Sequence, residues 1–474
     1  MDIPLTRDTK SVAIIGAGVS GMAAACALAE TGLRVQLIER RGYLGGRASS
    51  YLHPGVNEVI DNCQHVLFGC CTNLLAFYRR IGAENKIHWT SDMTMIEPGG
   101  KRSVLGPSPL PAPLHGFPRL LTSSAFNLAD KLSLARAFSA ILKVDPKDSG
   151  TESLADWLTR HRQSRGAIER FWKLVIASAL NADLEHIAVP YAAKVIRELF
   201  MNSAEAGRMG INAVPLSELY TQVPGLLAQS GSSIHLNSNV ERLEWSQEKS
   251  QWTVTTRTET LTADFVIFAL PFEAMAKLLP QMPSAPGADA LAGQIAQHEH
   301  WPICSAHLWF DREITELDHA VMLDREVHWL FNRSKLQPWR KTEGSYIEVE
   351  VSASRVYAAR ERNDAIALTL RELAEFFPAV SAAKLVKAAL VKEVRATFGV
   401  PPGIDAYRPA AAQSPWPNSF LAGDWAATGW PSTMESAARS GHLAAEAVCA
   451  SVGANARFLA PDLKPRGLMK LLRS

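Results

Sequence analysis

The chain has 474 residues, enough for about two or three domains. Its 49 Lys and Arg residues nearly balance 47 Asp and Glu residues, a formal net charge of +2, which excludes a strongly basic nucleic-acid binder and a charged disordered protein. Hydrophobic residues make up 47% and charged residues 20%, below the roughly 25% of an average soluble domain. We therefore expect a large core, with apolar surface or cavity lining left over.

The six cysteines have no metal-binding spacing, and a chain of this length needs no disulfides. We therefore predict a reduced, cytoplasmic setting and no metal site. Residues 11–29 carry no charge and resemble a signal peptide or a membrane span. Asp2 and Asp8 contradict a positive n-region, however, and the glycines within the run suit a nucleotide-binding turn, so we reject export.

The N-terminal segment has the order strand, turn, helix, strand. Residues 11–15 read as a short buried strand, followed by Gly16, Gly18 and Gly21, a helix over residues 21–30 and a second strand over residues 34–38. In this fingerprint the first glycine allows the tight turn, the second lets the backbone approach a pyrophosphate, and the third allows close packing of helix and strand. The helix N-terminus attracts phosphates. The sequence predicts a dinucleotide site.

Glu39 closes the second strand, where a carboxylate accepts hydrogen bonds from both ribose hydroxyls and disfavours a 2′-phosphate. Arg40 follows it, and then Gly45, Gly46 and Arg47. Glycine amides can face a pyrophosphate, and an arginine offers it a forked donor. This continuation favours a flavin dinucleotide over NADP.

A second motif lies near the C-terminus. Residues 420–425 read as a strand that runs into a glycine turn and an acid, Gly423 and Asp424. A helix then runs to about residue 451, and Ser432 with Glu435 fits a capping box at its start. A helix N-terminus stabilises the negative charge of a reduced flavin.

Together these motifs resemble the FAD-dependent amine oxidase and phytoene desaturase superfamily. The resemblance implies an α/β fold, with a Rossmann-like FAD-binding domain of the GR2 type and an inserted α+β substrate domain. It places Val240 against adenine, Asp424 on the ribityl chain, and the backbone of Thr433 and Met434 at the flavin pyrimidine edge. The full set that it implies for non-covalent FAD binding is Gly16, Gly18, Gly21, Glu39, Arg40, Gly46, Arg47, Val240, Gly423, Asp424, Thr433 and Met434.

Three separated pieces, residues 1–100, 215–285 and 395–455, are expected to form the FAD domain. Its middle piece reads as strands over residues 234–243, 252–257 and 264–271. Residues 101–214 and 286–394 would form the substrate-binding, membrane-facing domain, and residues 456–474 a basic tail.

The first insertion has a proline-rich start and then helical patterns to about residue 208, with basic residues among apolar ones. It reads either as a core helix pair with solvated lysines, or as a basic amphipathic entry region that rests on a membrane and admits a lipid. The second insertion predicts strands over residues 304–310 and 345–352 and a helix over residues 363–377. We expect two of its six aromatic side chains to contact substrate: Trp301, Trp309, Trp329, Phe331, Trp339 and Tyr346.

A closer resemblance rests on residues 61–70, 329–333 and 423–437, which are similar to the hydroxysqualene dehydroxylases of bacterial hopanoid pathways. In that family Cys63 would be a glycine. The resemblance implies reductive removal of the allylic hydroxyl of hydroxysqualene, with reduced FAD giving squalene and water. It also implies a long-chain isoprenoid substrate, a place at the inner face of the cell membrane, and contact with prenyl synthases of the same pathway.

The departing hydroxyl requires a proton, and His65 and Asp61 are the candidate donors because they follow the flavin-binding segment. The alternative for His65 is a buried, hydrogen-bonded structural histidine. The resemblance also allows catalysis by the cofactor and the pocket without an acid residue. A carotenoid-type desaturase and a flavin-stabilised lipid carrier remain alternatives, whereas the apolar insertions argue against an amine oxidase. Since the sequence has a single dinucleotide fingerprint, we expect an external electron donor, with direct reduction by NADPH as the alternative.

Overall fold

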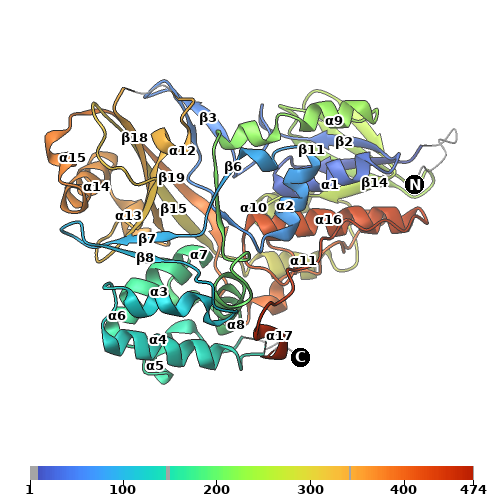
Figure 1. Cartoon of the computed structure of the whole chain (residues 1–474). Coiled ribbons are helices and arrows are strands. Elements are labelled where there is room, and N and C mark those ends of the chain that lie inside the picture. The colour runs from blue at the N-terminus through green and yellow to red at the C-terminus, as the bar shows by residue number, and fades with distance from the viewer. Residues whose placement is uncertain (1–8, 146–149, 341–342, 473–474) are drawn as a thin grey trace.

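The structure is a computed structural model that describes residues 9–145, 150–340 and 343–472. Asp2 and Asp8, which argue against a signal peptide, and the last two residues of the predicted tail lie outside these ranges. Figure 1 shows a part built on a parallel sheet at the right, and a second part at the left and below, where a mostly antiparallel sheet stands over a layer of helices.

The first part contains a five-stranded parallel sheet in the order β10-β2-β1-β14-β20. Every residue of the two central strands β1 and β14 is buried, as expected for apolar runs covered on both faces. The sheet joins strands from distant parts of the chain: β1 (Ser11–Ile15), β2 (Arg34–Ile38), β10 (Ser233–His235), β14 (Phe265–Phe268) and β20 (Ser419–Leu421).

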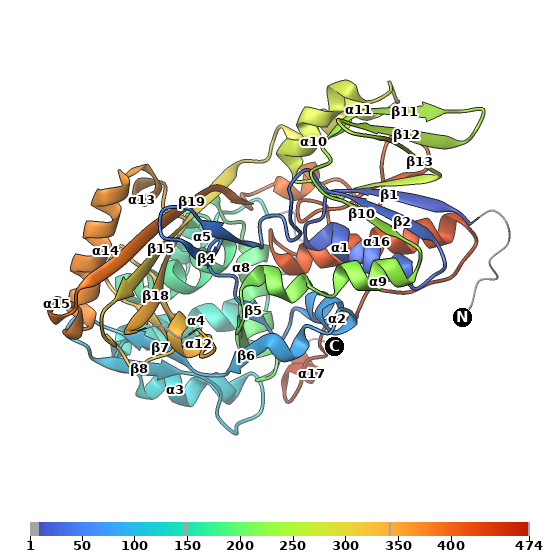
Figure 2. The ribbon, with the colours of Figure 1, turned by 90° about the horizontal axis from the view of Figure 1, so that it is seen from above.

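One face of this sheet is covered by α1 (Val19–Ala29) and α16 (Met434–Ser451), which pack on each other (Figure 2). Their approach requires a small residue, because a Cβ on Gly441 would lie 2.2 Å from the Ser20 carbonyl oxygen. The antiparallel sheet β11 (Val240–Ser246), β12 (Gln251–Thr256) and β13 (Thr260–Ala263) covers the other face. The predicted Rossmann-like α/β architecture is confirmed.

The strand predicted over residues 234–243 was wrong, because the chain turns within it. β10 ends at His235 and pairs with β2, whereas β11 begins at Val240 and belongs to the other sheet. Asn237 between them has φ of 55°, a left-handed conformation that breaks an extended strand. The amide of Asn237 bonds to the Arg41 carbonyl, which holds this turn beside the end of β2.

The second part contains a seven-stranded sheet in the order β19-β15-β18-β17-β16-β7-β8. Its strands are β7 (Met93–Ile96), β8 (Arg102–Leu105), β15 (His300–Phe310), β16 (His319–Met322), β17 (Trp329–Asn332), β18 (Ser345–Ser352) and β19 (Leu385–Phe398). β7 falls before the predicted domain boundary at residue 100, and the last residues of β19, 395–398, fall after the boundary at 395, so this sheet extends past both predicted boundaries. The cause is pairing: β7 runs parallel to β16 and so belongs to this sheet.

The two faces of the seven-stranded sheet differ in chemistry. Apolar residues of β15 and β18, such as Leu308 and Val349, pack under α14 (Arg362–Phe376), which lies outside the sheet with α13 (Arg355–Ala359) and α15 (Ala379–Ala382). The alternate residues face inward and include Ser305, His307 and Glu350. A period of two along a strand produces this segregation.

A layer of helices lies below the sheet: α3 (Phe117–Thr122), α4 (Leu128–Ile141), α5 (Leu154–Arg160), α6 (Arg165–Ala167), a π-helical stretch (Ile168–Ala177), α7 (Ser178–Leu180) and α8 (Val189–Ile196). The structure shows which side chains of this segment belong to the core, and contact with a membrane stays a prediction. Leu120, Leu134 and Phe138 are buried in the core, whereas Leu128 and Leu132 on the outer side are exposed.

The remaining elements link these parts. They include β3 (Ser50–His53), β4 (Glu58–Asp61), β5 (Leu67–Phe68), α2 (Thr72–Arg80), β6 (Ile87–Thr90), β9 (Met209–Asn212), α9 (Val223–Gln229), α10 (Phe272–Leu278), α11 (Ala288–Ile295), α12 (Arg333–Leu336) and α17 (Met469–Leu472). The tail is held in place, since the Leu468 amide bonds to the Ala112 carbonyl at 2.7 Å and Met469 is buried. All six cysteines are free and buried.

Candidate active site and cofactor site

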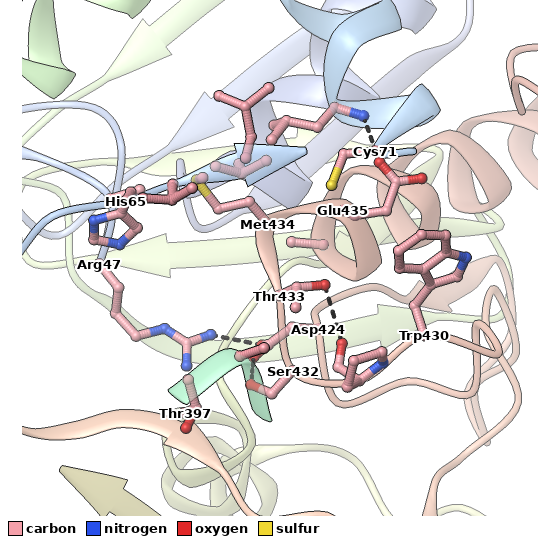
Figure 3. A pocket seen from close by; sticks show the side chains of 18 of the residues that line it. Arg47, His65, Cys71, Thr397, Asp424, Trp430, Ser432, Thr433, Met434 and Glu435 are labelled. Carbon is pink, nitrogen blue, oxygen red and sulfur yellow. Dashed lines mark hydrogen bonds and ion pairs between the residues drawn. The ribbon is translucent and has the colours of Figure 1, made fainter. Parts of the chain in front are cut away.

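A cavity of about 910 Å³ runs from the glycine turns of the parallel sheet to the inner face of the seven-stranded sheet. Eleven of the twelve predicted FAD-binding residues line it, and Gly21 does not. Figure 3 shows its middle section, with Arg47, Asp424 and Ser432 below and His65 and Met434 above. The cavity therefore brings together segments from both ends of the chain.

The three glycines of the first turn have different surroundings. Gly16 has φ of 103°, and a Cβ on Gly21 would lie 1.9 Å from the Gly16 carbonyl oxygen, so both positions require glycine for folding. A Cβ on Gly18 would meet no atom within 4 Å. Gly18 therefore faces open cavity, which leaves its backbone accessible to a pyrophosphate.

Glu39 holds this turn in shape. Its carboxylate accepts hydrogen bonds from the amides of Ala17 at 2.9 Å and Arg41 at 2.8 Å. The second glycine turn lies alongside, because the Gly45 amide bonds to the Ala17 carbonyl and a Cβ on Gly46 would lie 3.1 Å from the Gly18 Cα. The two turns form one cradle of backbone, and Glu39 and Arg40 line the cavity beside it.

Arg47, Asp424 and Ser432 form a hydrogen-bonded chain across the cavity (Figure 3). The Arg47 guanidinium donates to Asp424 Oδ1 at 2.6 Å and to the Ala396 carbonyl at 2.9 Å, and Ser432 donates to Asp424 Oδ2 at 2.6 Å. Burial alone would raise the pKa of Asp424, but Arg47 and Ser432 outweigh it and hold that pKa below the usual value. Arg47 thus orients the carboxylate predicted to bind the ribityl chain.

The capping box predicted at Ser432 and Glu435 was wrong. Thr433 is the N-cap of α16 and accepts from the Ser436 amide at 3.2 Å, while Ser432 bonds to Asp424. Glu435 turns instead to the start of α2, where it accepts from the Leu74 amide at 2.8 Å. The start of α16 still reaches the cavity, because Thr433 and Met434 line it.

Asp61 and His65, the candidate proton donors, occupy different environments. Asp61 is buried behind the cavity wall and accepts hydrogen bonds from Ser50 at 2.6 Å and Arg333 at 2.5 Å. Burial alone would raise the pKa of Asp61, but Arg333 together with the hydrogen bonds from Ser50, Asn212 and the Leu216 amide outweighs it. The pKa therefore falls below the usual value, and Asp61 is a buried anion. This geometry gives it a structural role.

His65 lines the cavity. Its Nδ1 lies 2.9 Å from the Cys63 carbonyl, which can only accept, so Nδ1 carries a proton and Nε2 is the acceptor of the neutral ring. Burial lowers the pKa of His65 despite that hydrogen bond. His65 is therefore a neutral hydrogen-bond acceptor at the cavity wall.

Sequence reasoning missed several carboxyl groups of this cavity, among them Glu350 on β18 and Glu393 on β19. The sequence did contain a signal for Glu350. Polar and apolar residues alternate over residues 345–352, which places Glu348 and Glu350 on the same face of a strand. Of the six aromatic candidates, Trp329 and Phe331 line the cavity, and their rings stack at 5.9 Å.

The residues of this site fit FAD. The cradle at Gly18 and Gly46 is open to the cavity, Glu39 suits a ribose, and the charge of Asp424 suits the hydroxyls of a ribityl chain. The dipole at the start of α16 is positioned to stabilise negative charge on a flavin ring.

Comparison with known proteins agrees with this geometry. The sequence profile described as "Flavin containing amine oxidoreductase" matches residues 19–449. The chain belongs to this family. Its members are FAD-dependent oxidoreductases, so the chain is an FAD-dependent enzyme.

Two desaturases are among the curated relatives of this chain. A probable zeta-carotene desaturase from Synechococcus elongatus is 27% identical to it, with 92% of this chain and 98% of that protein covered. A 15-cis-phytoene desaturase from the same organism is 25% identical, with 93% and 96% covered.

Solved structures with the same fold include an oxidoreductase from Methanosarcina mazei, with a TM-score of 0.71, 16% identity, and 93% of this chain and 100% of that chain covered. Cyclohexylamine oxidase from Brevibacterium oxydans has a TM-score of 0.67 at 19% identity, with 94% and 100% covered.

Proposed function

We propose that the protein is an FAD-dependent dehydroxylase that converts hydroxysqualene to squalene and water. One observation carries this proposal: residues 61–70 and 329–333, two segments similar to hydroxysqualene dehydroxylases, are in direct contact. Arg333 donates to Asp61 and to Gln64, both at 2.5 Å. His65 from one segment and Trp329 from the other line the same cavity. Residues far apart in sequence thus build one wall of the substrate site.

The chemistry of the cavity supports a long hydrocarbon substrate. Bound FAD, once reduced, supplies the hydride that replaces the hydroxyl. Aromatic and aliphatic side chains, among them Phe171, Val175, Trp329 and Phe331, surround the space beyond the cofactor site. An apolar wall excludes water, and aromatic faces stabilise allylic cation character in the substrate.

The test is conversion by the purified holoenzyme. Hydroxysqualene and chemically reduced FAD are supplied without oxygen, and squalene is measured by mass spectrometry. We expect squalene in proportion to enzyme, and none from a Gly18→Val variant that lacks flavin. Absence of squalene with a fully flavin-loaded enzyme contradicts the proposal.

A second candidate is desaturation of a carotenoid-type substrate, favoured by the similarity to zeta-carotene and phytoene desaturases. This reaction runs in the opposite redox direction, so it starts from oxidised FAD. The same holoenzyme is incubated with phytoene or zeta-carotene and a quinone. New conjugated double bonds in the absorbance spectrum, without squalene formation in the first assay, favour this candidate.

We also propose that the protein is peripheral to the inner face of the cell membrane. Exposed leucines from α3, α4 and the tail support this: Leu121, Leu128, Leu132, Leu468 and Leu471. Lys131 bonds to the Leu121 carbonyl, and the tail bonds to Ala112, which keeps these segments adjacent. Phe117 and Leu120 of α3 line the cavity, so a lipid could enter there. Among the described residues, no helix has the length and hydropathy to cross a membrane.

We further propose that an external donor reduces the flavin. The glycine cradle beside β1 opens into the cavity that contains Arg47 and Asp424, which assigns this nucleotide site to FAD. The test is anaerobic stopped-flow mixing of oxidised holoenzyme with NADH or NADPH. We expect little flavin bleaching until a flavin reductase is added. Bleaching by NADPH alone at the turnover rate contradicts an external donor.

A further inference from the structure

Glu350 is a buried carboxyl group in the wall of the cavity. It lies on β18, faces inward, and is paired in register with Trp329 on β17 and Ser305 on β15. Trp329, Phe331 and Ile303 line the cavity around it. Glu350 is 5% exposed and is itself one of the residues that line the cavity.

The charges around Glu350 leave it without a cation of its own. Within the described residues, Arg333 is the guanidinium that acts on all three buried carboxyls, Asp61, Glu348 and Glu350. Arg340 acts on Glu348 as well, but it is paired with Glu58 at 3.9 Å. Arg333 lies 2.5 Å from Asp61 and 3.6 Å from Glu348. One positive charge cannot balance three buried negative charges, so at least one carboxyl of the group holds a proton.

The proton is best assigned to Glu350. Its Oε2 accepts one hydrogen bond, from the Gln64 amide at 2.8 Å. Burial and the neighbouring Glu348 raise the pKa of Glu350 well above the usual value, and Gln64 and Arg333 offset this only in part. Burial also raises the pKa of Glu348, to about 7, but Glu348 accepts from Ser305 at 2.9 Å and lies nearer to Arg333.

The other titratable groups near Glu350 do not supply the missing charge. Burial lowers the pKa of His307 to about 3 and raises the pKa of Cys304 to about 11, so both are neutral at pH 7. Burial also raises the pKa of Cys63, whose thiol lies against the Ile303 carbonyl. The two further cations of this environment have other partners: Arg340 is paired with Glu58 at 3.9 Å, and Lys392 donates to the Arg360 carbonyl. The remaining groups, His65, Tyr346 and Glu393, add no positive charge.

We propose that Glu350 is the proton donor to the departing hydroxyl group of an allylic alcohol substrate. This inference rests on the proposed function. The carbon–oxygen bond breaks with its electron pair on oxygen, and oxygen takes the Glu350 proton and leaves as water. The hydride from the reduced cofactor completes the hydrocarbon, and the Glu350 carboxylate recovers a proton from solvent. A neutral His65 accepts hydrogen bonds in this cavity and does not compete as the donor.

The test compares Glu350→Gln with Glu393→Gln, a carboxyl of the same cavity on β19, which is separated from β18 by β15. Both are prepared as holoenzymes and checked for flavin content. Since general acids contribute about 10²–10⁴-fold, we expect Glu350→Gln to lower the single-turnover rate by at least about 10²-fold. The wild-type rate should fall as the pH rises through the Glu350 pKa, and Glu393→Gln should keep this dependence.

A spectroscopic measurement tests the proton itself. The infrared spectrum of the wild-type holoenzyme at pH 7 should contain a carboxylic-acid C=O band that shifts in D₂O, persists in Glu393→Gln and is lost in Glu350→Gln. Glu350→Asp keeps the acid and should recover part of the rate, which covers the case in which Glu350→Gln fails to fold.

The outcomes separate the two proposals. A flavin-loaded wild-type enzyme that never converts hydroxysqualene overturns the proposed function and this inference with it. Conversion by Glu350→Gln at the wild-type rate, or an unchanged infrared band in that variant, overturns the role of Glu350 alone. A folded Glu350→Asp enzyme without any recovery of rate does the same.

Discussion

Arg333 Nη2 lies 2.5 Å from Asp61 Oδ2, and both side chains are almost completely buried. Arg333 follows β17 at the start of α12, whereas Asp61 ends β4, so the pair connects the seven-stranded sheet to the segment that lines the cofactor cavity. A second bond from Arg333 to Gln64 fixes the neighbouring loop. The pair therefore positions the cavity wall that contains His65.

Replacing Arg333 with leucine should destabilise the protein strongly, because Asp61 would remain as an unpaired buried charge. We expect a loss of about 3–5 kcal/mol in unfolding free energy, measured by urea denaturation. The double change Arg333→Leu with Asp61→Asn should recover part of it. As a control, Arg325→Leu breaks a partly exposed pair with Glu375 and should cost at most about 1 kcal/mol. Equal losses in both arginine variants would contradict the prediction.

Much of the cofactor domain could be predicted because its signals are local. β1 and β2 have the predicted bounds, since an apolar run followed by glycines in register leaves few other folds. The role of Asp61 could not be predicted, because it depends on Arg333, which lies 272 residues away. The partner of Glu435 was missed for the same reason, since the Leu74 amide lies 361 residues away. Ser432 was misassigned for a different reason: it bonds to Asp424 in the preceding loop, and Thr433 caps the helix instead.

Cys63 combines a backbone conformation that favours glycine with a buried side chain. It has φ of 70°, a left-handed conformation, which accounts for the glycine expected there from the resemblance. The side chain is nonetheless buried, among residues that include Trp309 and Tyr346. The resemblance to the family indicated that residue 63 is an unusual position. The space for the Cys63 side chain, however, is formed by residues of the folded sheet and could not be predicted from the sequence.

Two glycines of the first turn should separate cofactor binding from folding. Gly18→Val places its side chain in open cavity, so we expect a folded protein that cannot accept a pyrophosphate. Gly21→Val would drive its side chain into the Gly16 carbonyl, so we expect loss of folded protein.

The measurement is flavin absorbance, with and without added FAD, together with circular dichroism. Wild-type protein should release free FAD on denaturation, since binding is expected to be non-covalent. A yellow Gly18→Val protein contradicts the cofactor assignment, and a stable Gly21→Val protein contradicts the packing argument.

Two buried histidines should make the protein less stable in acid. Burial lowers the pKa of His307 and of His442 from 6.5 to about 3. The unfolded chain therefore binds protons below pH 6.5 that the folded chain does not. Stability is fully present above pH 6.5 and falls as the pH drops toward 3, by about 1.4 kcal/mol per pH unit for each histidine.

This slope is measured by urea denaturation at several pH values from 7 to about 5. His307→Phe removes one titrating group while keeping a ring beside Trp309 and Tyr346. We expect its pH slope to be smaller than that of the wild type by about one proton. An identical slope in the variant contradicts the assignment of His307 as a neutral buried group.

The exposed leucines of α4 and the tail provide the test of membrane binding. The triple variant Leu128→Ser, Leu132→Ser and Leu471→Ser removes side chains that are 73%, 58% and 76% exposed. Because each leucine is worth about 1.5–3 kcal/mol when fully buried, co-sedimentation with anionic vesicles should weaken at least about tenfold. Leu52→Ser on β3, remote from this surface in Figure 1 and 60% exposed, should bind as the wild type does.

High salt should weaken binding of every form, since screening reduces the attraction of basic residues to anionic lipid. Wild-type protein that stays in the supernatant at low salt contradicts the membrane proposal, and equal losses in the two variants contradict the choice of surface.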